Sequence, residues 1–202
     1  MLNDERFRAA QRRFEAYWQG EELDRCLIAV TAPVGAPRPA RRAAGLEARW
    51  TGAEAIYEDF TSGLRATWYG GEALPIHWPN LGPGVVSAFV GGGYRFTEDT
   101  VWFSELPGIE RMDAFDDLRL DKSGAMYCHA VRLMRTMAER SKGRYLVAMT
   151  DLGGGLDIAA SLMGVQPMLY AMADEPERVE ALLQAIDRAW TDAFRDFCAL
   201  LA

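Results

Sequence analysis

The chain has 202 residues, a length typical of one domain. Half of the residues are hydrophobic and a quarter are charged, a composition that predicts a packed core rather than disorder. The 29 acidic residues outnumber the 22 basic residues and give a net charge of −7, which argues against a nucleic-acid-binding surface. We therefore expect a globular protein whose partners include neither DNA nor RNA.

Cysteine usage and the absence of long apolar runs predict a cytoplasmic protein. Cys26, Cys128 and Cys198 are odd in number and far apart, so they indicate no disulfide framework, and no Cys-x-x-Cys motif occurs. The first eight residues, MLNDERFR, lack the apolar core of a signal peptide. No apolar run approaches the length of a membrane span. We expect no membrane partner.

Alternating helix-like and strand-like segments predict an α/β fold. Residues 4–19 have the apolar periodicity of an amphipathic helix, which Gly20 ends. Helical patterns also cover residues 46–66 (with a break near 51–52), 85–90, 123–141, 156–163, 167–172 and 174–202. The predicted strands are residues 27–31, 74–78, 100–103 and 145–149. Strands separated by helices indicate parallel βα units, and three or four units are too few to close an eight-unit barrel.

The stretch 145–157 has the pattern of a strand end that holds a ligand. Residues 145–149 are a short apolar run, and Thr150, Asp151 and three glycines then lead into a helical pattern. Because α/β proteins place ligands at such turns, Asp151 is the first candidate for a catalytic side chain. Alternatively, Asp151 caps the helix or holds the turn. Asp157 falls in the first helical turn, where it is either a second site carboxylate or a favourable charge for the helix dipole.

A second group of candidates follows the predicted strand at residues 74–78. His77 could act as an acid, a base or a hydrogen-bond donor near neutral pH, or it could be a satisfied, half-buried histidine. Trp78 and Trp102 each lie beside a strand end, so they are candidates for the walls of an apolar pocket, although core packing would also explain them.

Two glycine turns complete the set of candidate residues. Gly82 and Gly84 precede a predicted helix, and Gly153 begins the second turn. Neither turn matches a phosphate loop or a dinucleotide-binding fingerprint. They therefore predict either a close approach of the backbone to a ligand or ordinary turn chemistry.

Several motifs follow one another along the chain: EAYWQG at 15–20, LDRCLIAVTAP at 23–33, LGPG at 81–84, TVWF at 100–103, TDLGGGLD at 150–157 and DEPERV at 174–179. In this order they resemble motifs of uncharacterised uroporphyrinogen decarboxylase-like proteins. The superfamily also contains corrinoid-dependent methyltransferases, and its fold is a TIM barrel with the site at the carboxyl ends of the strands. Because its members are considerably longer, the resemblance implies that residues 1–202 form a single domain corresponding to the amino-terminal half of the barrel, with an amino-terminal helix.

Departures from the family pattern bear on the reaction. True uroporphyrinogen decarboxylases have an arginine-rich motif near the amino terminus that binds the carboxylates of the substrate. No such motif follows Val30 in this chain. Asn80 stands roughly where they use an aspartate, and it cannot supply the negative charge. The zinc methyltransferases use a His-x-Cys pair and a later cysteine, whereas Cys128 and His129 are adjacent and lie on a predicted helix. We expect no metal site or cofactor within this chain, and zinc only with ligands from a carboxyl-terminal half.

The resemblance thus implies a small-molecule methyltransferase that works with a corrinoid protein when the barrel is complete. Asp151, His77 and Asn80 would line the pocket in this half. Tetrapyrrole decarboxylation is the alternative reaction. A third possibility is a non-catalytic half barrel that forms a homo-oligomer or pairs with a complementary chain, because a half barrel leaves strand edges and an apolar layer exposed.

Overall fold

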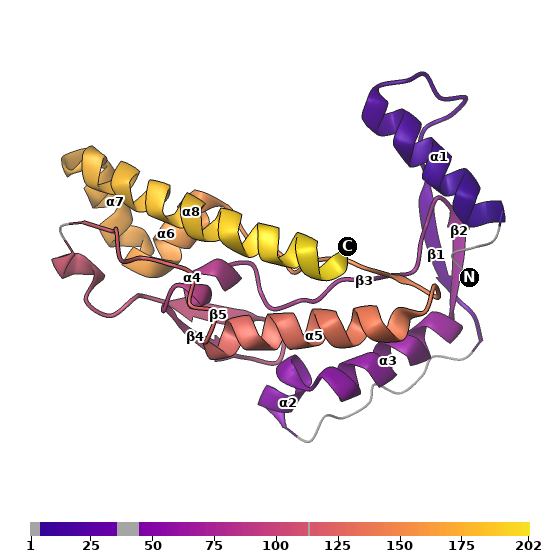
Figure 1. The fold of residues 1–202 in the computed structure, drawn as a ribbon, viewed down its shortest axis with the longest axis horizontal. Coiled ribbons are helices and arrows are strands. Elements are labelled where there is room, and N and C mark those ends of the chain that lie inside the picture. The colour runs from indigo at the N-terminus through magenta and orange to yellow at the C-terminus, as the bar shows by residue number, and fades with distance from the viewer. Residues whose placement is uncertain (1–4, 36–44, 113) are drawn as a thin grey trace.

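A computed structural model describes residues 5–35, 45–112 and 114–202 (Figure 1). Its helices are α1 (Glu5–Gln19), α2 (Leu46–Thr51), α3 (Ala53–Arg65), α4 (Val85–Phe89), α5 (Ala125–Ser141), α6 (Gly155–Met163), α7 (Val165–Asp174) and α8 (Pro176–Leu201), with a 3-10 turn at Ile109–Arg111. Its strands are β1 (Ala29–Pro33), β2 (Thr67–Gly71), β3 (Ile76–His77), β4 (Gly93–Phe96), β5 (Val101–Ser104) and β6 (Leu146–Val147). Within the described residues the strands form three two-stranded sheets.

The strands β3 and β6 form a parallel pair, as expected for βα units. Ile76 lies opposite Leu146 and His77 opposite Val147. Backbone hydrogen bonds extend the pair, from Leu146 N to Pro75 O and from Ala148 N to His77 O, both at 2.9 Å. Prolines at 75 and 79 cannot donate to a ladder, which limits β3 to two residues where the sequence predicts five.

The other two sheets are antiparallel ribbons. Strand β1 pairs with β2, and β4 pairs with β5. The sequence pattern predicts β1 and β5 but neither partner strand. Strand β2 follows α3 directly and ends in two glycines, while β4 begins at the last of three glycines, which otherwise indicate the end of a helix. The barrel assignment stays a prediction, because one parallel pair does not define a barrel.

Helices form most of the core. Every residue of α4 is buried, and α4 lies against α5, α6 and α8 (Figure 1). Phe89 contacts Tyr127 of α5 and Phe197 of α8 with ring centroids 5.3 and 6.0 Å apart, so three helices meet at one aromatic cluster. The predicted break in residues 46–66 is confirmed at Gly52, where a Cβ would lie 2.4 Å from the carbonyl oxygen of Ala48.

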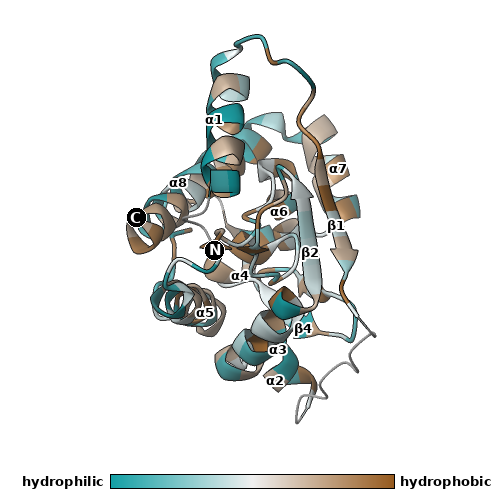
Figure 2. Cartoon of the chain, turned by 90° about the vertical axis from the view of Figure 1, so that its right-hand side faces the viewer, coloured by the Kyte–Doolittle hydropathy of each residue, from teal (hydrophilic) through white to brown (hydrophobic). Residues whose placement is uncertain are grey.

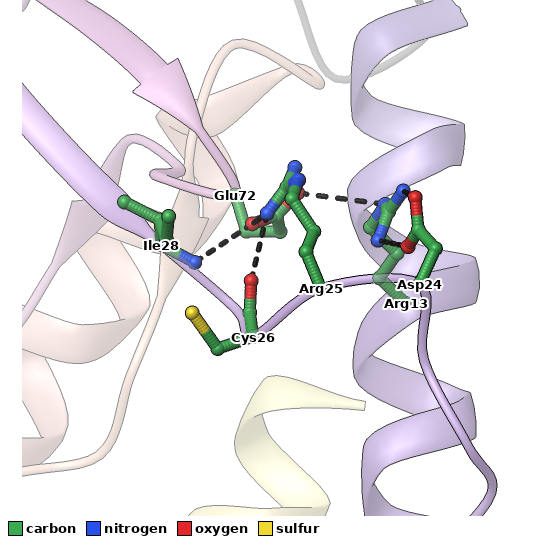
Figure 3. Close-up of polar contacts among 6 residues, drawn as sticks. All are labelled: Arg13, Asp24, Arg25, Cys26, Ile28 and Glu72. Carbon is green, nitrogen blue, oxygen red and sulfur yellow. Dashed lines mark hydrogen bonds and ion pairs between the residues drawn. The ribbon is translucent and has the colours of Figure 1, made fainter.

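Helix α1 and the β1–β2 ribbon stand beside the rest of the chain (Figure 1), and a buried carboxylate fastens them together. Glu72 is 4% exposed. It accepts two hydrogen bonds from the guanidinium of Arg25, at 2.6 and 2.8 Å, and one from Ile28 N at 2.9 Å (Figure 3). Arg13 of α1 approaches Glu72 to 3.7 Å. These contacts, those from Arg25 above all, lower the pKa of Glu72 to about 2.

Among the described residues, no single helix has the length and apolar character that crossing a membrane requires. The helices α6 and α7 reach that standard only when taken together, and they meet at an angle of 108°.

Replacing Glu72 with Gln should lower the free energy of unfolding at neutral pH by about 1.5–3 kcal/mol, the range for hydrogen bonds to charged groups. The depressed pKa means that the stabilisation is present above about pH 4.5 and is lost as the pH falls towards about 2. Urea unfolding of both proteins between pH 7 and pH 2.5 should show the difference shrinking over that window. A difference independent of pH would contradict the role of the charge. The exposed Asp24, changed to Asn, serves as a control with a smaller effect.

Candidate functional site

A cavity of about 290 Å³ lies at the carboxyl end of β3. Five segments line it: α2, α3, the end of β3, the β4–β5 turn and α5. The lining residues are Arg49, Trp50, Ile56, His77, Trp78, Pro79, Asn80, Glu98, Asp99 and Leu133. Three residues that the sequence singles out, His77, Trp78 and Asn80, therefore come together in one cavity.

His77 is the buried polar group of this cavity. It is 5% exposed, and its ring meets Phe60 edge to face with centroids 4.8 Å apart. Its Nδ1 has no hydrogen-bond partner among the described residues. Burial lowers the pKa of His77 to about 4, so the imidazole is neutral at physiological pH. A neutral imidazole can donate from one nitrogen and accept at the other. An unpaired buried nitrogen costs about 1–3 kcal/mol.

Asn80 and Trp78 lie at the exposed part of the lining. The Asn80 side-chain oxygen accepts a hydrogen bond from Gly82 N at 3.2 Å, which orients the amide. That bond leaves the two N–H donors of the amide for another group. Trp78 is 51% exposed and supplies an apolar wall that meets solvent.

Charged side chains at the cavity come from segments that the sequence does not single out. Arg49 belongs to α2, while Glu98 and Asp99 belong to the turn between β4 and β5, and all three are exposed. Trp50 Nε1 donates to Thr97 O at 2.7 Å and so holds this turn against α2. Glu98 and Asp99 are adjacent in the sequence, but such an acidic pair is indistinguishable from ordinary solvation.

The two aspartates predicted near residue 151 do not line this cavity. Asp151 is exposed, and its Oδ1 accepts a hydrogen bond from Gly153 N at 2.9 Å. This hydrogen bond is the one expected if Asp151 holds the turn, which was the alternative to a catalytic role. Asp157 is exposed in the first turn of α6, where its charge suits the helix dipole.

The predicted glycine turns pack against protein. Gly153 has φ +71°, and a Cβ there would lie 2.5 Å from Pro83 O, so the two turns meet backbone to backbone. Gly82 has φ +86°, and a Cβ would lie 2.9 Å from the Cβ of Val101. At Gly84 a Cβ would meet the Phe103 ring at 2.9 Å. These close approaches account for the glycines without a ligand.

Trp102 and Thr150 are not among the residues that line the cavity. Trp102 lies on β5 opposite Arg95, is 60% exposed and is outside the cavity lining. Thr150 is 1% exposed, and its Oγ1 has no partner among the described residues. His77 and Thr150 thus place unpaired polar atoms at or just after the ends of both strands of the parallel pair. In the sequence, Thr150 stands out only as the polar residue that ends the apolar run 145–149.

The described residues contain no group of three or more His, Cys, Asp or Glu side chains that could hold a metal ion. Cys128 Sγ lies 3.6 Å from Lys122 O, and His129 Nδ1 lies 2.9 Å from Arg132 Nη2. Both side chains thus have partners within the fold, and Arg132 also donates to Thr51 O, which ties α5 to α2. These residues do not fit a zinc site.

A scan against models of known protein families, a search of curated proteins and a search of solved structures found no match to the chain.

The pKa of His77 should be about 4, well below that of a free histidine, and NMR titration of the two histidine rings measures it directly. Because the pKa is depressed in the folded state, the free energy of unfolding should fall as the pH drops from about 6.5 towards about 4. Replacing His77 with Phe should remove that part of the pH dependence, while His129→Gln should retain it. A His77 titration near pH 6.5 would contradict burial of an unpaired ring.

Proposed function

We propose that this chain supplies a small-molecule-binding site to a uroporphyrinogen decarboxylase-like enzyme, and that the reaction of the assembled barrel is methyl transfer with a corrinoid protein. The observation that carries the binding site is the cavity at the end of β3 with the buried polar side chain of His77 among its lining residues. Polar groups that converge in an apolar pocket are the usual mark of a ligand site. The reaction class rests on the sequence resemblance.

The size and charge of the cavity favour methyl transfer over tetrapyrrole decarboxylation. A volume of about 290 Å³ lies at the low end of ligand pockets, which typically span about 300–1,000 Å³. A tetrapyrrole with several carboxylates is larger than the ligands such a cavity encloses. The lining carries one guanidinium, from Arg49, against the carboxylates of Glu98 and Asp99, so it repels a polyanion.

Three of the lining residues have a role in this proposal. The neutral His77 forms a hydrogen bond to the substrate or accepts a proton from it, Asn80 donates hydrogen bonds, and Trp78 excludes water. Zinc would need ligands beyond those described here, so none of these roles depends on it. A cytoplasmic location is part of the proposal, and the three free, exposed cysteines suit a reducing compartment.

The activity test uses methylcobalamin as methyl donor and a small thiol as acceptor, under anoxic conditions. The barrel assembled from this chain and its carboxyl-terminal half should accelerate loss of the methylcobalamin absorbance. His77→Phe should lower that rate by at least about tenfold, since general acid–base groups contribute about 10²–10⁴-fold. Trp102→Phe, outside the cavity, should leave it unchanged. Consumption of uroporphyrinogen instead would favour the decarboxylase. No turnover of either compound by the assembled barrel would contradict an enzymatic role and favour the non-catalytic alternative.

A specific surface supports that alternative, in which the chain pairs with a second copy or a complementary chain. The β1–β2 ribbon exposes Val30 and Trp68, at 45% and 53% respectively (Figure 2 shows the hydrophobic colour along β1). Ile28 and Val34, just outside β1, are exposed as well. Among the described residues each strand of the ribbon pairs only with the other, so two edges are open to another strand.

If the ribbon mediates association, the chain should elute as an oligomer in size-exclusion chromatography with light scattering. Val30→Glu should raise the apparent dissociation constant at least about tenfold, because it places a charge in an apolar contact. Thr31→Glu adds the same charge to the opposite face of the strand and should have a smaller effect. A monodisperse monomer at all concentrations would contradict the pairing proposal.

A further inference from the structure

We infer that the His77 cavity binds a short molecule with an ammonium group at one end and an uncharged hydrogen-bonding group, such as a hydroxyl, at the other. This inference rests on the small-molecule function proposed above and specifies the ligand class. It uses the difference in exposure between the charged and the uncharged polar groups of the cavity lining.

Exposed residues of the lining carry its charges. Arg49, Glu98 and Asp99 are all exposed, and the two carboxylates are consecutive in the turn that Trp50 holds through Thr97. Two carboxylates against one guanidinium give this part of the lining a net charge of −1. A cationic end of a ligand is therefore favoured there over an anionic end. An ammonium is compact and offers three donors, which suits two neighbouring carboxylates.

Buried residues of the lining carry no charge. Leu133 and Trp50 are 3% and 8% exposed, and His77 is the buried polar side chain among them. Because its imidazole is neutral, it cannot compensate a buried ligand charge, and an uncompensated charge there would be strongly unfavourable. A hydroxyl can satisfy either tautomer, since it both donates and accepts.

Apolar side chains make up the rest of the lining. They are Ile56, Pro79 and Trp78, and they suit a short aliphatic linker. The exposed indole of Trp78, in the same lining, can also attract a cation through its π face. The ligand expected from these features is a short amino alcohol.

Four probes with the same four-carbon chain separate the contributions: 4-amino-1-butanol, butylamine, 1,4-butanediol and 4-hydroxybutyrate. Binding to the 202-residue chain at pH 7 is followed by saturation-transfer NMR and by shifts of the Trp78 indole resonance. The amino alcohol should bind at least about fivefold more tightly than 4-hydroxybutyrate, the size of effect expected from an exposed ion pair. It should also bind more tightly than butylamine.

Variants test which residues produce the preference. The double variant Glu98→Gln, Asp99→Asn should abolish the preference for the amine, whereas Asp116→Asn, Asp117→Asn, an exposed acidic pair outside the cavity, should retain it. His77→Phe should weaken binding of the amino alcohol and leave binding of butylamine nearly unchanged. Circular dichroism checks that each variant is folded.

The outcomes distinguish failure of the ligand class from failure of the cavity. Tightest binding of 4-hydroxybutyrate, or a preference that survives removal of both carboxylates, would overturn the ligand class while leaving a small-molecule site in place. If no probe shifts Trp78 or responds to the His77 substitution, both the ligand class and the proposed binding function fail.

Discussion

Two backbone hydrogen bonds hold the candidate site together. Leu146 N donates to Pro75 O and Ala148 N donates to His77 O, which joins segments about seventy residues apart into the parallel pair β3–β6. The pair fixes the end of β3, and the cavity opens at that end. Tyr145, beside β6, and His77, in β3, both pack edge to face on Phe60 of α3. Loss of this short pairing would leave His77 without its burial and the cavity without its wall.

The proposed ligand class follows from which residues of the cavity lining carry charge. Burial keeps His77 neutral, and the exposed turn carries Glu98 and Asp99. A buried uncharged hydrogen-bonding group and an exposed acidic turn give the cavity two unlike ends, which favours a small bifunctional ligand over a polyanion. The same arrangement suits methyl transfer to or from a small molecule better than decarboxylation of a tetrapyrrole. Asp151 lies outside the cavity, where it holds its own turn.

Local sequence signals predict elements well but not the contacts between them. The break at Gly52, the presence of a helix from near Pro176 and the strands around 76 and 146 follow from glycine, proline and apolar patterns, although Asp174, the predicted helix start, is the last residue of α7. Strand β2 could not be predicted in this way, because its pairing with β1 is a tertiary contact. The same reason hides Arg49, which lies 28 residues before His77 in the chain and reaches the cavity through the packing of α2. His77 was identifiable because its strand end is a local feature.

Amide hydrogen exchange at Leu146 and Ala148, read residue by residue by NMR, tests most directly whether the parallel pair builds the site. Both amides donate across or just beyond the pair, so they should exchange far more slowly than unstructured amides. Ala130, fully buried in α5, reports whether the chain as a whole is folded. Protection at all three residues is the predicted result. Protection at Ala130 with free exchange at Leu146 and Ala148 would show a folded chain without the pair, and would contradict this account of the cavity.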